Sequence, residues 1–408
     1  MQQSKTEHIS EQEAKGQLEQ QAGLSFEYAH AQYNKNLKQW SFAVKNKAGA
    51  VVFSAVSFKD FAPYRALAQH LNTSFDEVLD RYVFVYGAQH ECGQGQDDER
   101  YCLIDKGWLK EEGIEITEKP FDASNDATTA LLAGDIDIFS NYGTSGPLQT
   151  IASGENLQII GGYMATGCMP IITRTDNPDE WKGVESLVGK TVAADASDYT
   201  IAGTLLEKGY DPKTDVKWVH YPNYSDMTAA VIKGEVDYAV VGSSRNFEVS
   251  QQPKLKVAAY LSDLMPWYSC CRMVVTDKYL KENRDTMKKV IKTLLRAQAY
   301  YEASDANKEE CKKILGKRMN VTEDYLNSYM NNEHFRISVD PLKHEVERGW
   351  NILGKTGFLS EGWENINVDD HIQTELYKEA LDEAEKDYGS ENPEFYKKMQ
   401  DFYTEHNA

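Results

Sequence analysis

Two stretches of the chain that repeat one pattern decide the fold: FDASNDATTALLAGDIDIFSNYGTSG over residues 121–146 and YPNYSDMTAAVIKGEVDYAVVGSSRN over residues 221–246. They align without a gap at an offset of 100 residues. Upstream, LIDKGWLKEEGIEI from Leu103 is similar to LLEKGYDPKTDVKWV from Leu205, so the likeness extends beyond one helix. The identical pairs within the repeat are Asp126 and Asp226, Thr128 and Thr228, Gly134 and Gly234, and Asp137 and Asp237.

Each copy predicts the same order of elements. A helix ends at Lys-Gly, where glycine adopts the left-handed cap conformation, and a strand follows over residues 114–121 or 216–222. Next comes Asp-x-Thr, whose side-chain oxygens we expect to cap a second helix, which closes on Gly134 or Gly234 before another strand. Alternating strands and helices at this spacing predict parallel βαβ units. Two such units predict an α/β protein with two similar lobes.

Two apolar, β-branched segments are candidate hinge strands between the lobes: CMPIITRTD from Cys168 and SCCRMVVTDKY from Ser269. A chain that leaves one lobe, builds a second and returns connects the two lobes twice. The ligand site is then expected in the cleft between them, because open α/β sheets bind ligands beyond the carboxyl ends of their strands. A hairpin from Ser41 is also predicted, with no function attached to it.

The composition excludes some functions. The formal net charge of −20 disfavours nucleic-acid binding, which depends on lysine and arginine displacing counterions from phosphates. It does not exclude a small anionic ligand, because charges are screened over about 8 Å at physiological salt. No apolar run approaches the roughly 20 residues that span a bilayer. Six cysteines are too few for a disulfide scaffold and show no spacing typical of structural zinc.

Seven motifs in a fixed order resemble a known family, the solute-binding proteins of the alkanesulfonate, taurine and nitrate type, which are related to binders of the thiamine pyrimidine precursor. The resemblance runs from about Tyr82 to about Tyr329. The motifs are YVFVYGAQ, DKGWLKEEGIEI, ALLAGDIDIFSNYGTSGPL, IASGENLQIIGGY, GVESLVGKTVAADASDYT, LLEKGYDPKTDVKWVHYP and AVIKGEVDYAVVG.

The resemblance implies a type-II periplasmic-binding-protein fold, with a ligand cleft between two lobes joined by two hinge strands. It also implies an extracytoplasmic, monomeric receptor that binds a small solute and docks on an ABC-type permease, with no cofactor, no metal and no enzymatic activity. The polar N-terminus fits a tether that a lipid could anchor to the membrane. We expect a tether over residues 1–25, an extension over 26–80, lobe 1 over 81–172 and 273–345, lobe 2 over 173–272, and a helical extension over 346–408.

Candidate ligand-binding residues follow strand ends or begin helices, where free backbone N–H groups favour negative charge. The alternative is that these Ser, Thr and Gly residues form turns and caps. Lobe 1 supplies Gln89, His90, Asn141, Tyr142, Gly143, Thr144 and Ser145, and lobe 2 supplies Ser197, Asp198, Tyr199, Thr200, Ser243 and Arg245.

Trp267 and Tyr268, just before the return hinge strand, complete the set of candidates, because aromatic side chains in a cleft stack on flat ligands or cage cations. Arg245 suits a sulfonate or carboxylate, and its alternative is an ordinary ion pair. The ligand is therefore expected to be a small organic anion similar to taurine. The alternatives are a binder of a flat aromatic heterocycle and a pyrimidine-synthesising enzyme on the same fold. Catalytic motifs such as GxSxG and HExxH are absent from the sequence, and the acidic loop from His90 to Glu99 is interpreted as solvated.

Overall fold

The structure is a computed structural model in which two units are described separately. The first comprises Met1–Tyr86 with Thr117–Pro120, and the second comprises Gly87–Ile116 with Phe121–Ala408. The residues that the structure describes are 28–34, 39–45, 51–53, 106–116, 119, 121, 124–194, 197–221, 224–319 and 321–408.

The first unit contains a three-stranded antiparallel sheet in the order β1-β2-β3, formed by Tyr28–Asn34, Gln39–Lys45 and Val51–Phe53. Its last two strands pair in the region where a hairpin from Ser41 is predicted. The tether expected over residues 1–25 lies outside the described residues.

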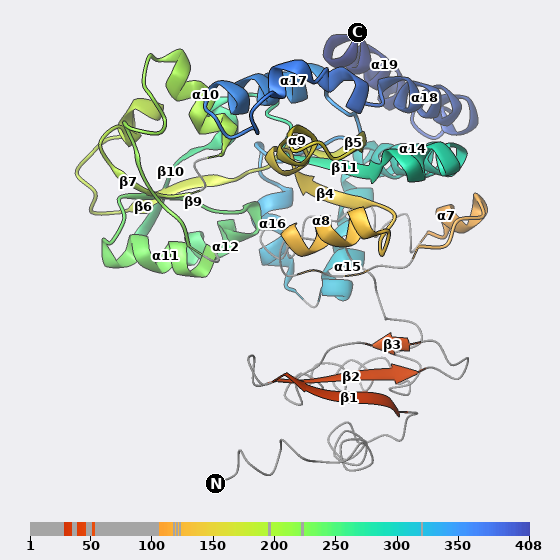
Figure 1. The fold of residues 1–408 in the computed structure, drawn as a ribbon, viewed down its shortest axis with the longest axis horizontal. Helices are drawn as coiled ribbons and strands as arrows, with labels where there is room; N and C mark the ends of the chain where they lie inside the picture. Colours follow the sequence, from red (N-terminus) through yellow and green to blue (C-terminus); the bar gives the residue numbers. More distant parts are fainter. Residues whose placement is uncertain are drawn as a thin grey trace. The chain divides into compact units, whose positions relative to one another are not determined.

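The second unit holds two sheets, each with its own helices (Figure 1). We call the part around the four-stranded sheet β12-β5-β11-β4 lobe 1, and the part around the five-stranded sheet β10-β6-β9-β7-β8 lobe 2. The strands of lobe 1 are β4 Phe139–Gly143, β5 Leu157–Thr166, β11 Cys271–Thr276 and β12 Arg336–Ile337. Those of lobe 2 are β6 Pro170–Arg174, β7 Thr191–Ala193, β8 Lys217–Val219, β9 Tyr238–Val240 and β10 Leu255–Tyr260.

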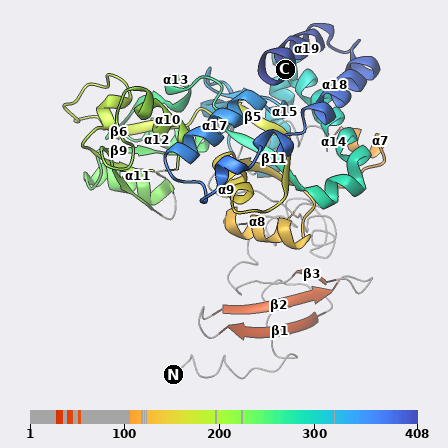
Figure 2. The ribbon, with the colours of Figure 1, turned by 45° about the horizontal axis from the view of Figure 1, so that its top comes forward.

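Helices surround both sheets, as a second view shows (Figure 2). No helix in the described part of the chain is long and apolar enough to cross a membrane. The helices are α7 Trp108–Glu111, α8 Ser124–Ala133, α9 Ser145–Ala152, α10 Tyr199–Glu207, α11 Tyr224–Lys233, α12 Asn246–Gln251, α13 Leu261–Leu264, α14 Asp277–Ala303, α15 Asp305–Met319, α16 Glu323–Met330, α17 Lys343–Lys355, α18 Thr374–Tyr388 and α19 Pro393–Asn407.

The repeat in the sequence is also a repeat in the structure, because α8 and α11 begin and end 100 residues apart. The glycine after each helix has a left-handed backbone, with φ of 80° at Gly134 and 77° at Gly234. The backbone bonds that close each helix are also equivalent, as Gly134 N donates to Leu131 O and Gly234 N to Val231 O. The predicted glycine-terminated helices are therefore confirmed in both lobes.

The predicted capping role of the two threonines is wrong. Thr128 Oγ1 donates to Ser124 O at 2.8 Å, and Thr228 Oγ1 donates to Tyr224 O at 2.8 Å. Each threonine therefore lies inside the helix and bonds the carbonyl four residues earlier, as hydroxyl side chains in helix interiors commonly do. The strand pairing is parallel among β7, β8 and β9 of lobe 2, whereas the described pairs of lobe 1 are antiparallel.

Each lobe has its own apolar core. In lobe 2, Ile172, Val231 and Val241 are fully buried between the sheet and α11. In lobe 1, the long helix α14 packs on β5, β11 and α18, where burial of side chains such as Ile291 and Leu376 stabilises the fold by about 1.5–3 kcal/mol each.

Helix α17 contacts both lobes: it packs against α9 of lobe 1 and α10 of lobe 2 (Figure 1). Its contact with α10 is close, because a Cβ atom on Gly203 would lie 2.5 Å from Ile352 Cδ1. A Cβ atom on Gly349 would lie 3.4 Å from the ring of Tyr199 and 3.5 Å from Leu148. These glycines allow one helix to lie against both lobes.

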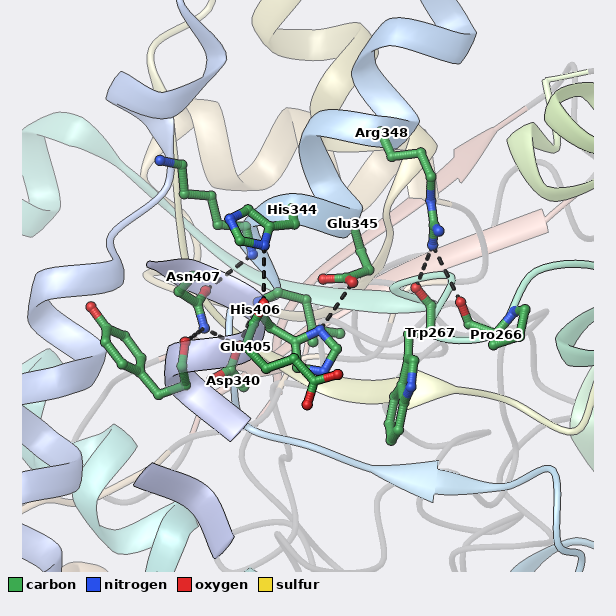
Figure 3. A network of polar contacts seen from close by, with 12 residues as sticks. Pro266, Trp267, Asp340, His344, Glu345, Arg348, Glu405, His406 and Asn407 are labelled. Carbon is green, nitrogen blue, oxygen red and sulfur yellow. Dashed lines mark hydrogen bonds and ion pairs between the residues drawn. The ribbon is translucent and has the colours of Figure 1, made fainter. Parts of the chain in front are cut away.

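The end of α19 lies against the start of α17 through buried polar contacts (Figure 3). His406 Nδ1 lies 3.0 Å from Glu345 Oε1, and both side chains are buried. Asn407 Nδ2 donates to Asp340 Oδ1 at 2.8 Å, and Leu342 N donates to the same oxygen at 2.7 Å.

Burial shapes the ionisation of two of these groups. Burial opposes the charged form of His406, but the hydrogen bond to Glu345 and the nearby carboxylates outweigh it and raise the pKa of His406 above its ordinary value of 6.5. Burial raises the pKa of Asp340 to about 6, against the hydrogen bonds from Asn407 and Leu342. Both groups therefore keep their proton up to a higher pH in the folded protein than in the unfolded chain.

We therefore expect the free energy of unfolding to fall as pH rises from 6.5 through the folded pKa of His406. Asp340 adds a fall in the same direction between about pH 4 and 6. His406→Gln should lower the free energy of unfolding at pH 6 by about 1–3 kcal/mol, because buried Glu345 loses its charged partner. It should also remove most of the pH dependence above 6.5.

Urea unfolding from pH 5.5 to 8.5 measures this dependence. The control is His220→Gln, which changes an exposed histidine of lobe 2. An equal pH dependence in wild type and His406→Gln would contradict the assignment.

Candidate functional site

The chain crosses between the lobes twice, and the two crossings lie side by side. The first, residues 167–169, leads from β5 to β6, and the second, residues 265–270, leads from α13 to β11. Tyr268 Oη accepts a hydrogen bond from Gly167 N and donates one to Gly167 O, each at 2.9 Å. A Cβ atom on Gly167 would lie 3.0 Å from Ser243 Oγ and 3.2 Å from Tyr268 Oη, so this close approach requires glycine.

The second crossing has an unusual backbone. Trp267 and Ser269 have left-handed φ values of 53° and 55°, a conformation that side chains other than glycine seldom adopt. Both lobes hold it in place through its carbonyl groups. Arg348 of α17 donates to the carbonyl oxygen of Trp267 at 2.7 Å (Figure 3). From lobe 2, Tyr199 Oη donates to the carbonyl of Tyr268, and burial raises the pKa of this phenol.

Beside the crossings, lobe 1 contacts lobe 2 directly. Ser145 Oγ, at the first residue of α9, donates to Ser197 O at 3.0 Å. Thr144 Oγ1 donates to the carbonyl of Ser269 in the second crossing. Asp198 is the N-cap of α10, where its Oδ1 accepts from Thr200 N at 2.9 Å. The N-termini of α9 and α10 therefore meet next to the crossings.

Asn141 has the most unmet hydrogen-bonding capacity in this region, where Ser243 Oγ and Arg272 Nε are also buried without a hydrogen-bond partner among the described residues. It lies in β4 three residues before Thr144, is fully buried, and neither its Oδ1 nor its Nδ2 has a partner among the residues that the structure describes. A buried amide without a partner costs about 1–3 kcal/mol. Such a group is completed by a bound ligand or by an ordered water.

The structure thus brings several predicted residues together at the crossings and places the others as follows. Ser243 is fully buried near Gly167. Gly143 ends β4, where it pairs with Cys271, and Thr200 is buried in the first turn of α10. Tyr142 is buried, its ring stacks on Phe139 at 4.2 Å, and its hydroxyl forms a hydrogen bond with Thr128 Oγ1 at 2.7 Å, so it belongs to the core under α8.

The side chains of Arg245 and Trp267 do not join the predicted residues that meet at the crossings. Arg245 Nη1 pairs with Glu248 Oε1 at 2.6 Å, the ion pair that was the alternative for this residue. The ring of Trp267 lies 5.2 Å from that of Phe402 and 5.4 Å from that of His406, both in α19. Gln89 and His90 lie outside the described residues. Within the described part of the chain, His, Cys, Asp and Glu form no group suited to a metal ion.

Sequence reasoning missed three polar residues that support the site. Arg272 is fully buried in β11, where burial lowers its pKa, and it donates to Asp340 O and Met164 O at 2.8 Å each. Arg348 holds the second crossing, and Asn246 Nδ2 donates to Cys168 O at 2.8 Å. No pattern around an arginine inside the apolar run CCRMVV distinguishes a structural cation from a ligand-binding one.

Comparisons with solved structures support the fold. The nitrate-binding protein NrtA from Synechocystis PCC 6803 superposes with a TM-score of 0.58 at 18% identity, covering 70% of this chain and 86% of that one. The aliphatic sulphonate-binding protein SsuA from Escherichia coli gives a TM-score of 0.56 at 20% identity, covering 69% and 96%. SsuA from Xanthomonas axonopodis pv. citri, bound to MOPS, gives 0.54 at 16% identity, covering 68% and 95%. The expected periplasmic-binding-protein fold is confirmed.

No curated protein matches the sequence. The model of the family described as "NMT1/THI5 like" matches residues 100–306, which is half of the chain and includes both crossings and both copies of the repeat. The chain therefore belongs to the NMT1/THI5-like family.

Proposed function

We propose that this protein is an extracytoplasmic receptor, not an enzyme, that binds a small organic anion between its lobes and delivers it to an ABC-type permease. The observation that carries the proposal is Asn141, a fully buried amide without a partner among the described residues, four residues before Ser145, which bonds Ser197 across the lobes. The crossings next to it provide the hinge about which two such lobes close.

The N-terminus of α9 favours an anion, whereas the carboxylate of Asp198 already caps that of α10. Backbone N–H groups at a helix N-terminus attract negative charge, and α9 has no side-chain cap that occupies them. Arg245, the cation predicted for the site, is already paired with Glu248. The proposed solute is therefore held by N–H groups, hydroxyls and the Asn141 amide, which suits a sulfonate or a similar singly charged group. The sulfonate and nitrate binders of the same fold accord with this class.

Ligand binding then follows a simple free-energy argument. A solute that contacts both lobes stabilises the closed form over the open form by its difference in affinity, and this difference drives closure. Asn141 and Ser145 contribute from lobe 1, while Ser197 and Thr200 contribute from lobe 2. The permease is proposed to recognise the closed form.

Asn141→Leu should raise the free energy of unfolding of the ligand-free protein by about 1 kcal/mol, because it replaces a buried unpartnered amide with an apolar group of similar size. Urea denaturation measures the change. The matched control is Asn246→Leu, also buried, whose Nδ2 donates to Cys168 O at 2.8 Å and to Ser243 O at 2.7 Å. That control should lower the free energy of unfolding by about 1–3 kcal/mol. If both variants lose stability equally, Asn141 is an ordinary structural amide.

A thermal-shift series with methanesulfonate, taurine, MOPS and nitrate tests the function. A true ligand at about 100 times its Kd adds about 2.7 kcal/mol to the free energy of unfolding, which raises Tm by several degrees. Asn141→Leu should reduce this shift by more than half while the variant itself melts no earlier than wild type. Choline and pyrimidines complete the series. Shifts from these alone would replace the proposed anion with a cation or a heterocycle, and no shift from any solute would overturn the receptor proposal.

A further inference from the structure

A cavity of about 810 Å³ lies in lobe 1 between β12, the helices α14 to α16, and the C-terminal helix α19. This volume falls in the range typical of small-molecule sites. Tyr301, Met330, Phe335 and Met399 are buried side chains of its wall, so much of the lining is apolar. None of the residues assigned to the proposed solute site lines this cavity, so the two sites are separate.

One side of the cavity is an aromatic group, Trp267 with Phe402, whose ring centroids lie 5.2 Å apart. The guanidinium of Arg336 lies over the ring of Trp267, 5.2 Å from its centroid. Trp267 is partly exposed, and its backbone is fixed from behind by the bond from Arg348 to its carbonyl (Figure 3). The cavity therefore contains the flat ring of Trp267, whose backbone is fixed, with the planar guanidinium of Arg336 over it.

The ionised side chains that line the cavity determine whether it favours a cationic or an anionic ligand. Glu302 pairs with Lys398 at 2.9 Å, Asp305 pairs with Lys308 at 3.5 Å, and Glu309 pairs with Lys312.

Arg336 differs from these residues. Among the described residues, its guanidinium has no hydrogen-bond or ion-pair partner, and it lies over the ring of Trp267. Each carboxylate of the lining lies within ion-pair distance of a lysine, and one of these lysines, Lys312, is not itself part of the lining. Arg336 is therefore the lining cation left without a carboxylate partner among the described residues. Arginine binds carboxylates and sulfonates through two parallel N–H groups.

From this geometry we infer a second ligand site, specific for a flat aromatic carboxylate or sulfonate. The ring of the ligand stacks on Trp267 and meets Phe402, whose ring lies at 71° to that of Trp267, at its edge, and its anionic group binds the guanidinium of Arg336. The site lies outside the contact between the lobes, so a ligand here is not the solute proposed above. It adjoins the second crossing through Trp267.

Titration with 8-anilinonaphthalene-1-sulfonate, an aromatic sulfonate whose emission rises in apolar surroundings, tests the site in the full chain. Wild type should bind the dye with saturation. Arg336→Gln should weaken binding about tenfold or more, as loss of a hydrogen bond to a charged group does. Arg336→Lys should fall between the two, because lysine keeps the charge but lacks the planar fork. Arg336 is exposed, so neither variant is expected to affect folding.

Two controls separate this site from the first. Arg174→Gln removes a positive charge from lobe 2 and should leave dye affinity unchanged. Asn141→Leu should also leave it unchanged, while Arg336→Gln should keep the wild-type thermal shift with small sulfonates. Absence of saturable dye binding, equal affinity in wild type and Arg336→Gln, or loss of binding in Asn141→Leu would each overturn the second site. The thermal-shift series decides the receptor proposal independently.

Discussion

The hydroxyl of Tyr268 bonds both the N–H and the carbonyl of Gly167, and the arrangement of the two lobes depends on this pair of bonds. It joins the two crossings at the point where any side chain on residue 167 would meet Ser243 and Tyr268 itself. The desolvated phenol stays neutral because burial raises its pKa well above its ordinary value, so it remains able to donate. Around this point Tyr199 and Thr144 hold the carbonyls of the second crossing from opposite lobes.

The fold could be predicted because the sequence patterns that specify its elements lie within short segments and occur twice in the chain. The 100-residue offset is reproduced by α8 and α11, and the glycines that end them need a backbone that other residues avoid. The apolar segments from Cys168 and Ser269 form β6 and β11, one in each sheet. Capping by Thr128 could not be predicted in the same way, since a hydroxyl satisfies a helix start or an interior carbonyl equally well and the local sequence does not distinguish them.

The candidate site was predictable only in part, for physical reasons. Ser145 and Ser197 follow strands in their lobes, so topology alone brings them near the cleft. The direction of Trp267 depends on a left-handed backbone that no glycine signals, and this turns its ring toward α19. Arg272 is buried because two carbonyls, from Met164 and Asp340, converge on it from distant segments. Because these hydrogen-bond partners are distant in the sequence, the residues next to Arg272 do not indicate that its charge is satisfied.

Helix α17 adds a third connection between the lobes, one that does not run along the crossings. Two lobes that are joined only by two adjacent crossings can rotate about those crossings as a hinge. Contact of α17 with α9 on one side and α10 on the other adds a support away from that hinge. The contacts are close because Gly203 of α10 and Gly349 of α17 carry no side chains, and Ile352 of α17 packs against Gly203. Any closure of the lobes about the crossings must therefore also move α17 against α9, against α10, or against both.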